Sequence, residues 1–96
     1  MDRIWRDLTS TWDTGSNWNG GTVPATSDTV FINATGTGPY TVTENISGTI
    51  NGLTINSADA TLNFASVTLT VSNATTLLDG AVTIGTAGAK LNTSTF

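Results

Sequence analysis

Residues 52–66 read GLTINSADATLNFAS, and residues 81–95 read AVTIGTAGAKLNTST. The two stretches align without a gap, and six of the fifteen aligned pairs are identical. The identical pairs are Thr54/Thr83, Ile55/Ile84, Ala58/Ala87, Ala60/Ala89, Leu62/Leu91 and Asn63/Asn92. An internal repeat of this length is typical of a chain that stacks one structural unit on the next. We call this alignment, which sets Leu62 against Leu91, the repeat register.

Apolar and polar residues alternate within and after the first copy of the repeat. The apolar positions are Leu53, Ile55, Ala60, Leu62, Phe64, Val67, Leu69 and Val71. A period of two predicts strands with one buried face. The polar residues 56–59, 65–66 and 72–75 separate these runs, and their composition predicts turns. One repeat is therefore expected to contain about three short strands.

A unit of this kind cannot bury its apolar face alone, but it can do so when similar units stack on it. The sequence therefore predicts an all-β fold, a short parallel β-solenoid (β-helix) of two to three coils. Residues 30–96 would form the coils, within a single domain overall. The alternative is a small antiparallel β-sandwich, which short strands at regular spacing also suit.

Composition excludes several classes of function. The chain has 96 residues, no cysteine, no histidine and a net charge of -4. Without these two residue types it lacks thiolate metal ligands, disulfides and the commonest general base. Its three basic residues are too few for a phosphate-binding surface, so we expect no nucleic-acid partner. No apolar run is long enough to span a membrane. We predict no enzyme activity, no cofactor, no metal site and no catalytic residue.

Residues 1–29 contain all three tryptophans: Trp5, Trp12 and Trp18. The first coil of a solenoid exposes apolar core and unpaired backbone, and large aromatic rings can cover them. We therefore predict that residues 1–29 form an N-terminal cap in which these tryptophans are contacts. The alternative is that they form a platform on which a sugar ligand stacks.

The opening of the chain resembles that of certain β-solenoid surface proteins. The resemblance rests on Trp12-Asp-Thr-Gly-Ser-Asn-Trp18, then Gly20-Gly-Thr-Val-Pro24, then Asp28-Thr-Val-Phe-Ile32. Similar openings begin phage virion and tail proteins, as well as units of bacterial secreted adhesins and autotransporter passengers. The resemblance implies a scaffold or attachment role, and it carries no binding residues over to this chain.

Two motifs suggest other chemistry. Asp13-Thr14-Gly15 matches the triplet of aspartic proteases, in which two such carboxylates share a proton and activate water. The flanking residues do not match that family, so a polar turn is the preferred interpretation. Asp13, Gly15 and Asn17 also alternate as in a calcium loop, but Pro24 stands where such a loop needs an acidic residue. An isolated calcium site near Asp13 or Asp28 is the remaining version of this hypothesis.

The N-terminus has no apolar segment of the kind found in a secretory signal. Together with Met1, this favours a virion component, such as a capsid decoration or tail-appendage subunit. A module of a secreted adhesin, extracellular or on the bacterial cell surface, is the alternative.

The third coil begins at Ala81 and reaches Phe96 only halfway round, which predicts an uncovered strand edge. Such edges recruit strands from neighbours. We therefore predict assembly through residues 81–96, with Leu91 and Phe96 as contacts. The partner would be the protein itself, with a trimer as the first candidate, or a larger capsid, tail or cell-surface assembly.

Overall fold

The computed structural model describes residues 2–36, 38–84 and 87–95. Within them it has eight strands, one short 3-10 helix and no α-helix. The strands are β1 (Asp2–Ile4), β2 (Ser10–Thr11), β3 (Thr29–Ile32), β4 (Tyr40–Glu44), β5 (Gly48–Ile50), β6 (Gly52–Phe64), β7 (Thr68–Thr83) and β8 (Lys90–Thr95), and the 3-10 helix η1 spans Gly15–Asn17. The prediction of an all-β chain is confirmed.

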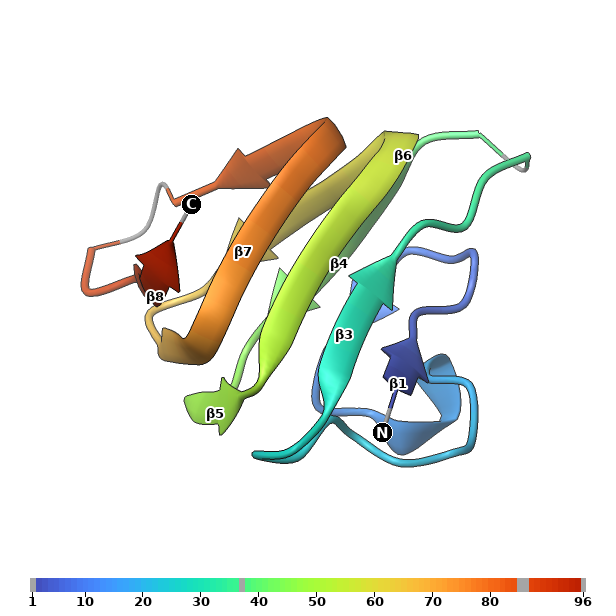
Figure 1. Ribbon diagram of the computed structural model, residues 1–96. Coiled ribbons are helices and arrows are strands. Elements are labelled where there is room, and N and C mark those ends of the chain that lie inside the picture. The colour runs from blue at the N-terminus through green and yellow to red at the C-terminus, as the bar shows by residue number, and fades with distance from the viewer. Residues whose placement is uncertain (1, 37, 85–86, 96) are drawn as a thin grey trace.

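The strands form a parallel, curled sheet (Figure 1). All pairings between the named strands of the described residues are parallel. The long strand β6 pairs with both β3 and β4 on one side and with β7 on the other. The antiparallel β-sandwich is therefore wrong, since its neighbouring strands would run in opposite directions.

The pairing of the strands differs from the repeat register. That register would place Leu62 beside Leu91, but Leu62 lies beside Val82, and Leu91 lies beside Leu69. The partners in these two pairs are thus closer together in the sequence than the two copies of the repeat. The repeat register is wrong because small and β-branched residues recur at most strand positions, so identities also arise between residues that are not neighbours.

Two of the predicted turns are absent. Residues 56–59 lie within β6, and residues 72–75 lie within β7. Both strands bend there while keeping parallel partners, and shifts of register mark the bends after Ile55 and after Val71. Polar, small residues favour a change of direction, but they do not distinguish a bend within a strand from a turn between strands. Residues 65–66 lie between β6 and β7, as predicted.

The core consists of columns of inward-facing side chains contributed by successive strands. Ile32 of β3 lies beside Ile55 of β6, and Val42 of β4 lies beside Leu62 of β6. All four are fully buried. The burial pattern of β4 alternates at every residue, which is the alternation expected of a strand with one buried face. The positions predicted to face inward are confirmed as buried, apart from Val67, which is half-buried.

A second column, of polar side chains, lies just before β6 and within β7. The Asn73 side-chain amide donates to the Asn51 carbonyl oxygen at 2.5 Å, and the Asn51 amide donates to the Thr29 hydroxyl at 3.2 Å. The backbone N–H of Asn73 also donates to the backbone carbonyl of Asn51 at 2.9 Å. These bonds satisfy backbone and side-chain groups where the chain changes direction, so they help to fix the register.

Gly80 fits closely against the bend of β6. Its φ is +103°, and a Cβ at this position would lie 2.6 Å from the Ser57 carbonyl oxygen and 2.8 Å from that of Ala60. Gly88 has a similar φ of +84°, but a Cβ there would have no atom within 4 Å. The two glycines therefore separate the cost of backbone strain from the cost of a steric clash.

We predict that Gly88→Ala lowers the free energy of unfolding by about 1 kcal/mol through backbone strain alone. Gly80→Ala should lower it by about 3 kcal/mol or more, because the clash adds to the strain. Urea unfolding followed by circular dichroism measures both values. Equal effects of the two substitutions would contradict the close packing of β7 on β6.

Candidate functional site

Trp5, Trp12 and Trp18 form one cluster at the N-terminal end of the sheet, which we call the Trp cluster. None of the three side chains is more than 2% exposed. Trp18 lies between the other two, with ring centroids 4.9 Å from Trp5 and 4.8 Å from Trp12 and interplanar angles of 82° and 75°. These edge-to-face contacts are favourable for aromatic rings. Rings buried in this way leave no face on which a sugar could stack.

The backbone around Trp18 covers the outer edge of β1. The Asn19 N–H donates to the Ile4 carbonyl at 2.8 Å, and the Arg6 N–H donates to the Asn17 carbonyl at 2.9 Å. Trp5 and Trp18 form an antiparallel bridge between these bonds. The Ile4 carbonyl at the end of β1 and the Arg6 N–H just after it are thus hydrogen-bonded within the chain.

Side chains from the same loop reach the end of β2. The Asn17 side-chain amide donates to the Thr11 carbonyl at 2.9 Å, and the Trp18 indole Nε1–H donates to the Trp12 carbonyl at 2.8 Å. Asn17 is buried, so its amide needs a partner of this kind. At the N-terminal end of the sheet, the tryptophan rings therefore fill the core, while side-chain N–H groups donate hydrogen bonds to backbone carbonyls.

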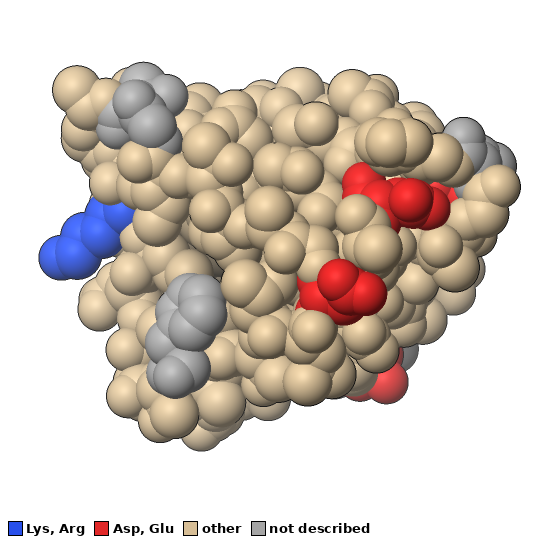
Figure 2. Space-filling model, turned by 90° about the horizontal axis from the view of Figure 1, so that it is seen from above, with Lys and Arg blue, Asp and Glu red and all other residues tan. Residues whose placement is uncertain are grey.

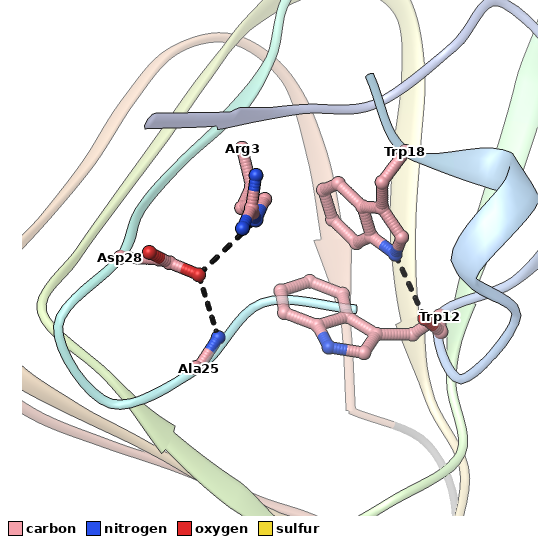
Figure 3. A network of polar contacts seen from close by, with 5 residues as sticks. All are labelled: Arg3, Trp12, Trp18, Ala25 and Asp28. Carbon is pink, nitrogen blue, oxygen red and sulfur yellow. Dashed lines mark hydrogen bonds and ion pairs between the residues drawn. The ribbon is translucent and has the colours of Figure 1, made fainter. Parts of the chain in front are cut away.

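An ion pair lies beside the Trp cluster (Figure 3). Nε of Arg3 lies 3.2 Å from Oδ2 of Asp28, and the same oxygen accepts a hydrogen bond from the Ala25 N–H at 2.8 Å. Asp28 is buried, with 4% of its surface exposed. The carboxylate proposed as a calcium ligand is thus already engaged by a guanidinium and a backbone N–H, and this connects β1 to the segment before β3.

Asp13, the residue of the protease-like triplet, lies exposed in the turn before η1. Its backbone N–H donates to Oδ1 of Asn45 at 3.2 Å. This position agrees with a polar turn. A proton-sharing dyad would need a second carboxylate in hydrogen-bond contact with Asp13. No such bond of the Asp13 carboxylate occurs within the described part of the chain.

The opposite end of the molecule is built from the second half of β7 and from β8 (Figure 1). We call residues 75–83 and 90–95 together the C-terminal edge. Leu91 lies there, half-buried against the core, while Leu77 is 37% exposed and Leu78 is 65% exposed. Phe96, the other predicted contact residue, lies outside the described residues. The structure thus gathers the three tryptophans at one end and places Leu91 at the other.

Glu44 is a buried carboxyl group at the end of β4, with none of its surface exposed. Its Oε1 accepts a hydrogen bond from the Ile46 N–H at 3.1 Å. Its Oε2 has no hydrogen-bond partner among the described residues. Burial raises the pKa of Glu44 to about 8, the bond from Ile46 opposes this shift, and repulsion from Asp13 adds to it. Glu44 is therefore mostly protonated at neutral pH.

The surface carries few charges, and Figure 2 shows one face on which acidic spots are separated by uncharged side chains. The described residues contain no group of three or more side chains suited to holding a metal ion. They also contain no helix that is long and apolar enough to cross a membrane.

Comparisons with protein-family models, with curated proteins and with solved structures found no match for this chain.

Sequence reasoning missed Glu44 and the Asn51–Asn73 pair. Asn51 is separated from Asn73 by the same spacing as Leu69 from Leu91, and this shared spacing was the available signal. Glu44 stands at an inward position of the alternation Tyr40, Val42, Glu44, which marks it as a buried acid once the strand is recognised.

We predict that Glu44 makes stability fall as the pH rises. An unperturbed Glu has a pKa of about 4.5, and Glu44 in the folded chain has a pKa of about 8. Between these two pH values the folded chain keeps a proton that the unfolded chain releases. The free energy of unfolding should then fall by up to about 1.4 kcal/mol per pH unit in this window, and the contribution is fully present only below it.

Glu44→Gln should remove this contribution, since the amide does not titrate, whereas the exposed control Asp79→Asn should keep it. Urea unfolding at a series of pH values from 4 to about 9 gives the slope of the free energy of unfolding against pH for each variant. If the amide destabilises the folded chain by the same amount at every pH, this slope does not change. Identical pH profiles for the wild type and Glu44→Gln would show that Glu44 is not the group responsible.

Proposed function

We propose that this chain is a non-catalytic structural protein that acts by protein–protein assembly. The observation that carries the proposal is the difference between its two ends. The Trp cluster and its hydrogen bonds cover one end, whereas the other presents exposed leucines along the C-terminal edge. An uncovered edge of parallel strands with apolar side chains beside it is suited to binding another protein.

We further propose that the curled parallel sheet is a short β-solenoid and that residues 1–29 are its cap. Support comes from the inward columns that run from β3 to β6 and on to β7, each made of one residue per strand. A stack of this kind needs its first strands covered, and the loop around Trp18 supplies both the apolar and the polar groups for this.

The most specific version of the function is a phage virion component, either a capsid decoration protein or a tail-appendage subunit. It is supported by the resemblance of residues 12–32 to openings of such proteins and by a surface with few charges, over which other subunits can pack closely. The location would then be the virion.

The alternative is a module of a bacterial secreted β-solenoid adhesin, extracellular or on the cell surface. The same residues resemble the openings of such proteins. A carbohydrate role for Trp12 or Trp18 is not part of this proposal, because both rings are buried in the Trp cluster. We assign no catalytic role to Asp13, which lies in an exposed turn.

Immuno-electron microscopy with an antibody against the folded chain tests this function. We expect label on purified phage particles from the source culture, at a fixed place on the capsid or tail. Label on the cell envelope or on secreted fibres would favour the adhesin instead. Label confined to the cell interior would contradict both forms of the proposal.

A further inference from the structure

The apolar columns of the core end in partly exposed residues at the C-terminal edge. One column runs through Ile32 and Ile55, both fully buried, and ends at Leu77, which is 37% exposed. A second runs through Val42 and Leu62, both fully buried, and ends at Val82, which is only half-buried. The core therefore continues to the surface at this end.

The backbone of the same edge is paired on one side only. Residues 75–83 of β7 pair with β6, and β8 pairs with the first half of β7 and with Ala74. Within the part of the chain that the structure describes, no strand lies against the other side of either segment. Each segment thus offers backbone N–H and C=O groups to a further strand.

The charge of the chain is distributed unevenly between the two ends. Residues 1–74 hold six acidic and two basic residues, and therefore the whole formal net charge of -4. Residues 75–96 hold one acid, Asp79, and one base, Lys90, and are neutral. Two copies of this acidic chain repel each other least when they approach through their C-terminal edges.

We infer that the C-terminal edge binds the same edge of a second copy, giving a closed dimer with a two-fold axis. This inference rests on the proposed function, an assembly protein, and names its partner and mode of contact. In a two-fold contact the same patch serves both copies, so β8 would meet its counterpart in antiparallel orientation. The exposed side chains Leu77 and Leu78 of one copy would be covered by the other.

A head-to-tail arrangement through β1 would break bonds that the chain already makes. In that arrangement the C-terminal edge of one copy would pair with β1 of the next. The Ile4 carbonyl of β1 already accepts a hydrogen bond from the Asn19 N–H, and the Arg6 N–H just after β1 donates to the Asn17 carbonyl. A contact that uses the C-terminal edge of both copies leaves the Trp cluster intact. Because both edges are then occupied, the assembly contains only two subunits.

The size of the end face agrees with a reversible dimer. The molecule measures 30 × 28 × 23 Å along its principal axes, so a cross-section covers about 500 to 650 Å². Two such faces in contact would bury about 1,000 to 1,300 Å², which reaches the lower range of specific protein–protein interfaces. We therefore expect a weak, reversible contact.

Sedimentation-equilibrium measurements on the 96-residue protein, from about 1 to 500 µM, test the inference. We expect a monomer–dimer equilibrium with no larger species. Leu78→Asp, at a residue that is 65% exposed, should weaken association at least tenfold without unfolding the chain. The matched control Ile4→Asp, at a residue 36% exposed on β1, should leave it unchanged, and circular dichroism verifies the fold of both variants.

Single cysteines test the orientation, because the chain has none of its own. Under oxidation Asn92→Cys, on β8, should give disulfide-linked dimers, whereas Ser16→Cys, in η1, should not. Crosslinking that occurs only when the two variants are mixed would mean a head-to-tail contact and would overturn the inference.

A monomer at all concentrations, a trimer, or growth without limit would each also overturn it. These results would leave the proposed function standing if the antibody still labels phage particles or cell-surface fibres. A dimer of the expected kind, combined with label confined to the cell interior, would instead support the contact and contradict the function.

Discussion

The structure depends on one constraint: each parallel strand before the C-terminal edge is completed by a strand that comes later in the sequence. The backbone of β6 is satisfied only because β3 and β4 lie on one side and β7 lies on the other. The same register places Leu62 beside Val42 and Val82, and Ile55 beside Ile32 and Leu77. A shift by one residue would turn these side chains away from the core, so hydrogen bonding and burial enforce the same register.

A set of parallel strands that pair in sequence leaves a strand at each end, and the two ends of this chain differ in how far they are covered. At the N-terminal end, the Trp cluster fills the core, the segment around Trp18 hydrogen-bonds the outer side of β1, and the Arg3–Asp28 pair connects β1 to the segment before β3. At the C-terminal end, Leu77 and Leu78 remain exposed beside strands that are paired on one side. This difference between the ends is the physical basis of the proposed assembly role. A further strand can pair along the C-terminal edge without displacing existing contacts, whereas pairing along β1 would displace the bond from the Asn19 N–H to the Ile4 carbonyl.

Much of the fold could be predicted from the sequence, and the errors have particular causes. The alternation around Leu53, Leu62 and Leu69 identified the buried face because side chains in a strand alternate by geometry. The repeat register was wrong because threonine, alanine and asparagine recur so often that the true spacing of Asn51 and Asn73 did not stand out. Residues 56–59 were expected to turn because their composition is that of a turn, but pairing with β7 keeps them within a bent strand. The buried Trp cluster could be expected from three large rings near one end, whereas their exact partners, such as the Trp12 carbonyl for the Trp18 indole, depend on tertiary packing.

Cross-strand nuclear Overhauser effects test the register most directly. The register of the structure predicts short-range contacts between the backbones of Leu69 and Leu91 and between those of Leu62 and Val82. Both sets of contacts require parallel strands in the register of the structure. Backbone contacts between Leu62 and Leu91, without the two predicted pairs, would instead support the repeat register and contradict the stacking described here.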